Sequence, residues 1–284
     1  MSGVERLATA PGMGKAFARA LLPGTRGEGR IPDHTVELAP QRLDPARLAD
    51  YSRVCRFTLR DSVPATWIHV LTFPLHVHLL GDPRSSIRLV GAVHVSNTMT
   101  LHRPVDAAEP LTLAVRVENL RPHAKGALID LVGEARVGDE RVWDGVSTYL
   151  SPGAHAPGEP VPVPRAPFAP ADPHALWRLP QDLGRHYRRV SQDPNLIHTS
   201  RLAAKAFGFA RPIIHGMWTH ARALAALEGR LPPAYTATAS FVKPILLPAT
   251  VGFRATPTAD GHEAAVTSRD GAKPFLLMGV QRAS

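Results

Sequence analysis

Residues 216–242 read GMWTHARALAALEGRLPPAYTATASFV. Apolar side chains recur at helical spacing from Met217 to Leu231, which predicts a buried helix over these residues. Pro232 and Pro233 end this helix, because a proline ring is incompatible with a continuing helical backbone. The residues from Tyr235 to Val242 then predict a strand. A long buried helix that runs directly into strands indicates an α+β fold.

More strands follow, with turn signals between them. Asp260-Gly261 and Asp270-Gly271 are pairs that favour tight hairpin turns. A shorter helix over Ser200–Phe207 is expected before the long one, and it stops at Gly208. The strands expected in this part of the chain are Tyr235–Val242, Thr250–Thr256, Glu263–Ser268 and Phe275–Val280. The C-terminal part therefore reads as a helix packed on an antiparallel sheet.

The N-terminal part repeats this order. A helical apolar stretch from Trp67 to Leu80 contains Pro74, which predicts a kink. Arg103-Pro104-Val105 precedes a strand in the way that Lys243-Pro244-Ile245 does later in the chain. The strands expected in the N-terminal part are Leu89–Thr100, Leu111–Val117, Ala127–Ala135 and Val142–Leu150. The pattern suggests an internal duplication with a period of about 140 residues.

A proline-rich stretch separates the two parts. Its eight prolines are Pro152, Pro157, Pro160, Pro162, Pro164, Pro167, Pro170 and Pro173. Such density excludes a helix or a central strand and favours an extended connector. We therefore expect an N-terminal domain over residues 1–150, a linker over residues 151–174 and a C-terminal domain over residues 175–284.

The positive charge is concentrated in the second part of the chain. The 284 residues hold 33 Lys and Arg against 24 Asp and Glu, a net charge of +9. Residues 1–174 hold 19 basic and 18 acidic side chains, whereas residues 175–284 hold 14 and 6. This excess suggests an anionic partner, such as a phosphorylated small molecule or an acidic carrier protein, or a solvated basic face. Nucleic acid is disfavoured, because no zinc-finger spacing, RNP-like aromatic motif or long basic run occurs.

The remaining composition points to a globular protein in a reducing compartment. Apolar residues make up 44% of the chain, which argues against disorder. Cys55 is the single cysteine, so a disulfide framework and a cysteine zinc cluster are excluded and the cytoplasm is favoured. No run of 18 apolar residues occurs, so no membrane span is expected. Lys15 and Arg19 interrupt the apolar stretch over residues 13–22, which therefore does not read as a secretory signal.

Polar chemistry is densest in residues 187–198. Asp193 and His198 lie five residues apart around a proline-containing turn, so a loop sets their geometry. A carboxylate and an imidazole brought together can hold one water and exchange protons with it, which is the equipment for adding or removing water. The alternative is structural, since Asp and Asn also cap helices and stabilise turns.

A second signal is Gly216, which stands at the start of the predicted buried helix. Backbone N–H groups at a helix N-terminus have no intrahelical partner and lie at the positive end of the helix dipole. An oxygen that develops negative charge would be stabilised there, and glycine would let a substrate approach closely. The alternative is an ordinary loop glycine before a helix.

The string VSQDPNLIH at residues 190–198, followed by HGM at residues 215–217, resembles the hydratase motif of the MaoC-like, R-specific enoyl-CoA hydratases. The resemblance is good over roughly residues 185–255. It implies that Asp193 and His198 position and activate water, that Asn195 supports the loop and the water, and that the Gly216 N–H binds a thioester oxygen. The family usually has proline directly after the asparagine, whereas this chain has Leu196 there.

The whole chain is similar to the double-hotdog members of this family, which include the mycobacterial-type (3R)-hydroxyacyl-thioester dehydratases. The resemblance implies two curved antiparallel sheets, each wrapping a central helix. The N-terminal half has no Asp-x-Asn-x-x-His string, so the resemblance makes it a degenerate half that completes the fold and shapes the acyl tunnel. Its histidines are expected to be structural or on the surface: His69, His76, His78, His94 and His102.

Several other side chains are candidates for substrate binding. Arginines flank the two motifs and could bind the phosphates of coenzyme A or an acidic acyl carrier protein: Arg185, Arg188, Arg189 and Arg211. Trp218 and Phe241 are candidates for the acyl pocket, with core packing as the alternative. His215 is expected to position other groups rather than transfer protons, and His220 to pack within its helix.

These observations predict a hydro-lyase that interconverts trans-2-enoyl and (3R)-3-hydroxyacyl thioesters in fatty-acid metabolism. No metal and no redox cofactor are expected. The alternatives are a thioesterase on the same fold, a non-catalytic acyl-thioester-binding subunit and, on charge alone, a nucleic-acid-binding module. Because the usual pairing of two hotdog units is satisfied within one chain, either a monomer or a homodimer fits.

Overall fold

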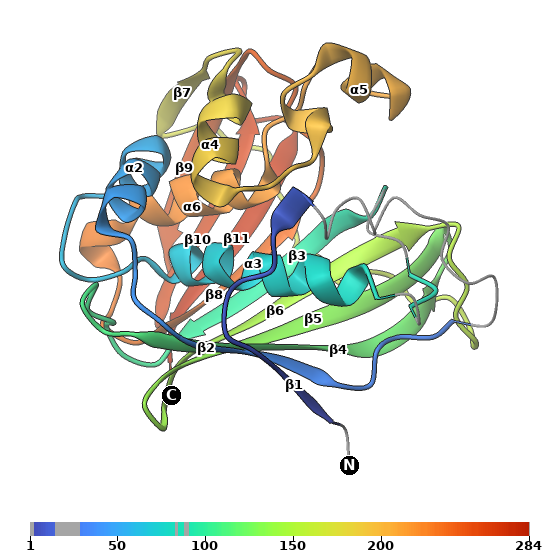
Figure 1. Ribbon diagram of the computed structural model, residues 1–284. Coiled ribbons are helices and arrows are strands. Elements are labelled where there is room, and N and C mark those ends of the chain that lie inside the picture. Colours follow the sequence, from blue (N-terminus) through green and yellow to red (C-terminus); the bar gives the residue numbers. More distant parts are fainter. Residues whose placement is uncertain (1–2, 15–28, 83–84, 88–90, 284) are drawn as a thin grey trace.

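A single curved sheet of eleven strands organises the described part of the chain (Figure 1). The computed structural model describes residues 3–14, 29–82, 85–87 and 91–283. The strands lie in the order β1-β2-β4-β5-β6-β3-β8-β11-β10-β9-β7. Their bounds are β1 Val4–Leu7, β2 Thr35–Gln41, β3 Val93–Leu101, β4 Leu111–His123, β5 Gly126–Val137, β6 Glu140–Pro152, β7 Ala175–Leu179, β8 Tyr235–Phe241, β9 Ala249–Pro257, β10 Gly261–Ser268 and β11 Pro274–Arg282.

The helices cover one side of this sheet (Figure 1). They are α2 Pro45–Cys55, α3 Ala65–Leu80, α4 Leu183–Ser191, α5 Arg201–Ala206 and α6 Gly216–Ala226, with short 3-10 helices at Leu196–His198 and Glu228–Arg230. Two of them, α3 and α6, are the central helices of the N-terminal and C-terminal halves. The expected double hotdog arrangement and the α+β class are confirmed, with one refinement. The two sheets are continuous, because β3 and β8 pair antiparallel from Ser96–Ser240 to Leu101–Tyr235.

The strands expected from the sequence are confirmed to within a few residues, apart from β4, which extends to His123. Residues 89 and 90 of the expected strand 89–100, and most of the apolar stretch 13–22, lie outside the described residues. The prediction omitted β1, β2, β7, α2 and α4. The helix α2 does carry a local signal, because the Asp44 side chain accepts hydrogen bonds from the N–H groups of Ala46 and Arg47, as an N-cap does.

The two halves repeat the same path. A strand, a helix, a central helix and four strands follow one another as β2-α2-α3-β3-β4-β5-β6 and as β7-α4-α6-β8-β9-β10-β11. The helices α2 and α4 both end on a residue with positive φ, Arg56 at 69° and Gln192 at 61°. The suggested duplication therefore has a structural counterpart in the described residues.

The two halves also share equivalent individual hydrogen bonds. The Val63 N–H donates to the Val105 carbonyl at 2.8 Å, and the Ile214 N–H donates to the Ile245 carbonyl at 3.0 Å. Both acceptors are the last residues of the related tripeptides at 103–105 and 243–245. The halves differ in the connector between their helices, which spans residues 56–64 in the first half and residues 192–215 in the second. The longer connector holds the sequence motif.

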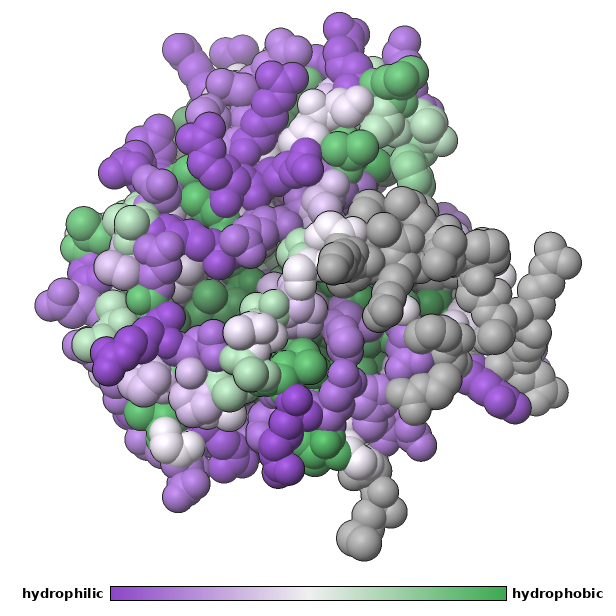
Figure 2. Space-filling view, in the orientation of Figure 1, coloured by the Kyte–Doolittle hydropathy of each residue, from purple (hydrophilic) through white to green (hydrophobic). Residues whose placement is uncertain are grey.

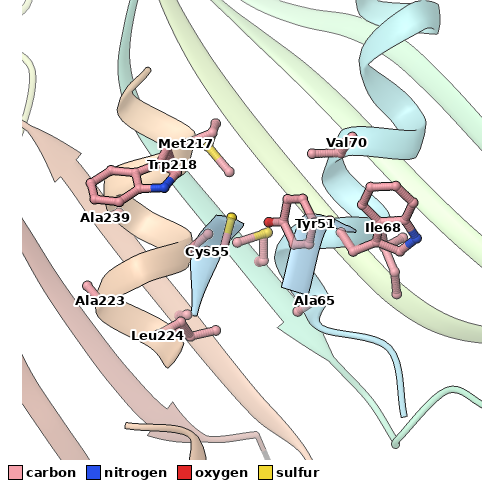
Figure 3. Close-up of a cluster of buried hydrophobic side chains, with 14 of the residues drawn as sticks. Tyr51, Cys55, Ala65, Ile68, Val70, Met217, Trp218, Ala223, Leu224 and Ala239 are labelled. Carbon is pink, nitrogen blue, oxygen red and sulfur yellow. The ribbon is translucent and has the colours of Figure 1, made fainter. Parts of the chain in front are cut away.

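One hydrophobic core joins the halves. In Figure 3, Tyr51 and Cys55 of α2 lie between α6, with Trp218, and α3, with Ile68. The Trp218 indole N–H donates a hydrogen bond to the Val54 carbonyl at 3.0 Å, so α6 is tied to the end of α2. In the reverse direction, Arg47 of α2 donates to the Val190 carbonyl at the end of α4, at 2.8 Å. The two halves are therefore held by shared packing as well as by the shared sheet.

The proline-rich stretch contains no helix or strand between residues 153 and 174, all of which are described. The division of the chain at residues 150 and 174 into two domains and a linker stays a prediction, because the two halves share one sheet and one core. Among the described residues, no helix is long and apolar enough to cross a membrane.

Dense packing around Gly145 in β6 leads to a stability prediction. A Cβ atom on Gly145 would lie 2.2 Å from Trp143 Cη2, and Trp143 is itself only 1% exposed. We expect Gly145→Ala to lower the free energy of unfolding by about 1–3 kcal/mol, because an overpacked core strains its neighbours. Urea denaturation measures the change.

Gly279 in β11 is the matched control, since a Cβ atom there would meet nothing within 4 Å. Gly279→Ala should change the free energy of unfolding by less than about 1 kcal/mol. Equal effects of the two substitutions would contradict the packing argument.

Candidate active site

A cavity of about 670 Å³ lies at the junction of the two halves. The C-terminal half contributes Asp193, Asn195, His198 and Gly216 to its lining, so the structure brings together all four residues predicted to be catalytic. The N-terminal half contributes residues of α3, β3 and β6: His69, Val70, Phe73, Val93, His94 and Tyr149. The sequence analysis did not find Tyr149 or Phe73, because no local pattern marks a residue that faces a cavity from the other half.

The loop that follows α4 is held by side chains that bond to nearby backbone groups. Asp193 accepts a hydrogen bond from the Asn195 N–H at 2.9 Å, and Asn195 in turn accepts one from the Ile197 N–H at 3.3 Å. The Ser191 hydroxyl accepts from the Asp193 N–H at 3.3 Å. These are the turn and capping roles that Asp and Asn fill well. The structural role of Asp193 and Asn195 is therefore confirmed, and their catalytic role stays a prediction.

His198 presents one ring nitrogen to the Asp193 carboxylate. Its Nδ1 lies 2.8 Å from the Ile213 carbonyl oxygen, which can only accept, so Nδ1 carries the proton and Nε2 keeps a lone pair. The distance from Nε2 to Asp193 Oδ2 is 4.0 Å, too long for a direct hydrogen bond. Two groups that share one water lie roughly 4–5 Å apart when each hydrogen bond is about 2.8 Å long. The spacing therefore suits one bridging water.

Burial sets the protonation of this pair. It raises the pKa of Asp193, and the nearby His198 and Arg188 oppose the rise. Burial also lowers the pKa of His198, and the Asp193 charge opposes that shift. His198 is therefore neutral near pH 7 and can act as a base, while Asp193 takes up a proton more readily than an exposed carboxyl group does. Opposed shifts of this kind suit acid–base chemistry.

His215 is the third member of this group. Its ring stacks on the His198 ring with centroids 3.6 Å apart, and its Nε2 lies 3.7 Å from Asp193 Oδ2. Burial holds the pKa of His215 well below its usual value, and the neighbouring His198 and Arg188 add to this. Tyr187 closes the other side at a centroid distance of 4.8 Å. This neutral, tightly packed ring agrees with the expected positioning role, which stays a prediction.

The three side chains also meet a minimum condition for a metal site. One potential ligand atom from each of Asp193, His198 and His215 lies within 4.8 Å of the others. Two imidazoles and a carboxylate are ligands that several divalent metals accept. The prediction that the reaction needs no metal is not tested by this arrangement and stays a prediction.

Gly216 lines the cavity as the first residue of α6. His215 precedes it at the N-cap and makes no side-chain cap, so the Gly216 N–H has no partner among the described residues. A Cβ atom here would lie 2.9 Å from Phe241 Cδ1, so only glycine fits without moving the ring. The helix N-terminus therefore presents a free donor to the cavity, as the sequence suggested.

The candidate substrate-binding residues are less uniform than expected. Trp218 does not line the cavity: it is 3% exposed and packs in the core, which corrects the prediction. Phe241 does line it. Arg188 of α4 is half-buried, and its guanidinium lies 3.5 Å from the hydroxyl of Thr199 in the following loop. It is therefore less exposed than a surface contact with a carrier would need.

None of the four arginines, Arg185, Arg188, Arg189 and Arg211, is part of the cavity lining. Arg185 and Arg189 are exposed on α4, while Arg211 is partly buried. Hydrophilic residues cover most of the face in Figure 2, and hydrophobic ones gather in smaller patches, one of them over α5. Leu202 of α5 is 81% exposed, and Phe207, directly after α5, is 46% exposed and lines the cavity.

The five N-terminal histidines expected to be structural or on the surface lie in three kinds of surroundings. His78 and His102 pair with acidic side chains, Glu5 and Asp144, and His76 is buried in the core. His69 and His94 line the cavity, so the expectation that they are only structural or on the surface is wrong for these two residues. They stand where the N-terminal half faces the site.

A double hotdog with a carboxylate, an imidazole and a helix N-terminus in the cavity between its halves defines a class of acid–base proteins. Comparisons with known proteins place the chain within it. The family model described as "MaoC like domain" matches residues 157–272. The chain is 37% identical over 236 residues to 3-hydroxyacyl-thioester dehydratase X of Mycobacterium tuberculosis, which covers 83% of this chain and 84% of that protein. The chain belongs to the MaoC-like family.

Solved structures agree with this assignment. A crystal structure of HtdX of Mycobacterium tuberculosis superposes with a TM-score of 0.79 at 33% identity, covering 88% of this chain and all of that one. A MaoC-like dehydratase from Phytophthora capsici reaches 0.73 at 17% identity, covering 88% of this chain and 95% of that one. A Mycobacterium tuberculosis protein described as having a double hotdog fold superposes with a TM-score of 0.54 at 14% identity, covering 90% of this chain and 96% of that one. The last two support the fold alone.

The buried histidines predict a loss of stability in mild acid. Burial lowers the pKa of His69 to about 4 and that of His220 to about 3. Between these values and the unfolded value near 6.5, the unfolded chain binds protons that the folded chain does not. The free energy of unfolding should therefore fall as the pH drops from 7 to 5, by up to about 1.4 kcal/mol per pH unit for each such histidine.

Urea denaturation at pH 7.5 and pH 5.5 measures this dependence. His220→Asn should make the pH dependence shallower, because it removes one proton-binding site of the unfolded chain. His155→Asn, at an exposed position, is the matched control and should leave the slope as it is. The same slope in both variants would contradict the assignment.

Proposed function

We propose that the protein is a hydro-lyase that interconverts (3R)-3-hydroxyacyl thioesters and trans-2-enoyl thioesters. The observation that carries the proposal is the 4.0 Å separation of His198 Nε2 and Asp193 Oδ2 in a cavity that also contains the helix N-terminus at Gly216. The 3-hydroxyacyl-thioester dehydratase named above is the family relative that supports this substrate class.

In the dehydration direction, His198 Nε2 removes the proton at C2 of the thioester. The electron pair of the broken C–H bond forms the C2–C3 double bond, and the C3–O bond breaks. Asp193, whose raised pKa favours the protonated form, gives its proton to the departing oxygen, which leaves as water. Hydration is the reverse: Asp193 takes a proton from the water that attacks C3, and His198 protonates C2. Atoms and charges balance in both directions.

The Gly216 N–H has the complementary task. A thioester oxygen held at the N-terminus of α6 gains negative charge as the C2 proton departs, and a free N–H at the positive end of a helix stabilises that charge. Asn195 supports the loop through its bond to the Ile197 N–H. His215 positions Asp193 and His198 by packing against both.

The thioester carrier and the assembly are part of the same proposal. The basic excess of the C-terminal half favours an anionic carrier, either coenzyme A or an acyl carrier protein. Arg185 and Arg189 of α4 are exposed and available for such a contact, and the partly buried Arg211 is a third candidate. The pairing of β3 with β8 within one chain supports a monomeric pseudo-dimer with one active site per chain, and a homodimer of such chains also fits. The relative named above supports a place in fatty-acid metabolism, and the single cysteine favours the cytoplasm.

Replacement of either member of the pair tests the mechanism. We expect Asp193→Asn and His198→Ala each to lower kcat for enoyl-thioester hydration by about 100- to 10,000-fold, because each removes one proton-transfer group. Loss of enoyl absorbance measures the rate, and chiral analysis of the product measures R-specificity. Asp260→Asn, in an exposed hairpin turn, is the matched control. Wild-type turnover in Asp193→Asn would exclude the proposed reaction.

The exposed arginines of α4 test the carrier contact. We expect the double variant Arg185→Ala, Arg189→Ala to raise KM for an acyl-CoA substrate several-fold at low ionic strength, with kcat unchanged. The effect should vanish near 1 M salt, where the Debye length is about 3 Å. Arg282→Ala, at an exposed position in β11, is the control. An unchanged KM at low salt would remove these arginines from the carrier site.

A further inference from the structure

The wall of the cavity that faces the catalytic loop is a row of three rings from the N-terminal half. Tyr149 of β6 and His94 of β3 are cross-strand partners, and their rings stack with centroids 4.5 Å apart and planes 14° apart. His94 in turn stacks on His69 of α3 at 5.9 Å and 21°. All three residues line the same cavity as Asp193. The half without the Asp-x-Asn-x-x-His string therefore contributes polar rings to the cavity wall.

Of these three residues, Tyr149 is the one that interacts electrostatically with Asp193. Tyr149 is 7% exposed, and its hydroxyl has no hydrogen-bond partner among the described residues. A hydroxyl without a protein partner in the wall of a cavity leaves its O–H available to a ligand. Burial raises the pKa of Tyr149, and the negative charge of Asp193 raises it further. The phenol therefore stays protonated, so that its O–H is available to donate a hydrogen bond and the group does not act as an acid or base.

The Tyr149 ring is held by its stacking on His94, which has a further aromatic neighbour. The His94 ring contacts Phe241 at a centroid distance of 4.8 Å, and Phe241 lies against Gly216, where a Cβ atom would be 2.9 Å from the ring. Tyr149, His94, Phe241 and Gly216 thus form a continuous packed path across the cavity. A donor held in this way needs no reorganisation when charge develops beside it.

We propose that Tyr149 is a further catalytic residue, whose hydroxyl donates a hydrogen bond to the oxygen that is added to, or lost from, C3 of the acyl thioester. This inference rests on the proposed function. While the C3–O bond is partly formed, this oxygen lies between C3 and the proton of Asp193 and bears its largest negative charge. Gly216 stabilises the thioester oxygen in the same interval, so each half of the protein provides one donor.

The role predicts a particular kinetic signature. An interaction that is stronger in the transition state than in the bound substrate lowers the barrier without tightening substrate binding. Tyr149→Phe keeps the ring stack on His94 and removes only the hydroxyl. We expect its kcat for enoyl-CoA hydration to fall at least tenfold, with KM within about twofold of wild type. The pH dependence of kcat should keep the shape set by Asp193 and His198, because the phenol transfers no proton.

Tyr235→Phe is the matched control. Tyr235 is also a buried tyrosine, 5% exposed in β8, but it does not line the cavity, and its variant should keep wild-type kcat. Thermal melting of both variants checks the fold. Asp193→Asn, assayed in parallel, separates the two proposals, since its full activity would exclude the reaction itself rather than the role of Tyr149.

Three results overturn the inference while the proposed function stands. They are a wild-type kcat in Tyr149→Phe, a raised KM with unchanged kcat, and a kcat loss that Tyr235→Phe shares. A selective loss of kcat in Tyr149→Phe, with KM and melting temperature preserved, supports it.

Discussion

The antiparallel pairing of β3 with β8 is the constraint on which the rest of the structure depends. It joins two sheets edge to edge, and the hydroxyls of Thr100 and Thr236 meet across the join at 2.9 Å. Because each sheet carries its central helix on the same side, the join also brings α3 and α6 into one core. The cavity lies at this junction, so its walls come from both halves and neither half would form it alone. The interface between the repeats is therefore where the proposed active site lies.

The two halves share a path but not a connector. Between its helices, the N-terminal half crosses residues 56–64, whereas the C-terminal half uses residues 192–215 for the same step. The extra length brings Asp193, His198 and His215 together at the start of α6. Hydrogen bonds to nearby backbone groups hold Asp193 and His198, and His215 packs against the His198 ring. Burial by the opposite half then separates their proton affinities: the pKa of the carboxyl group rises and that of each imidazole falls. The chemistry thus depends on an insertion within an otherwise repeated framework.

Local patterns predicted much of this framework. The buried helix expected at 217–231 is confirmed as α6, which ends earlier, at Ala226, and is followed by a 3-10 turn. The hairpin strands were readable because alternation and turn residues act over a few positions. The helices α2 and α4 were missed although α4 is clearly amphipathic, because both are short and are supported by contacts with each other and, for α2, with α6. Trp218 was assigned to the pocket because an aromatic residue beside a glycine motif suits either a pocket or a core. A second signal was available in Trp67-x-His69, which recurs as Trp218-x-His220 at equivalent helix positions and would have indicated a shared core role for the two tryptophans.

The sequence by itself determined the order of helices and strands, the catalytic string at 190–198 and the glycine that opens α6, because turn formation, capping and amphipathic spacing are interactions between near neighbours in the chain. The tertiary structure alone decided which residues of the N-terminal half face Asp193, how far His198 lies from it and which tautomer it adopts. Those properties arise from contacts between residues more than 40 positions apart, such as Tyr149 and Asp193, or from a hydrogen bond such as the one between His198 and the Ile213 carbonyl. They exist only once the two halves close on a common cavity and exclude water from it.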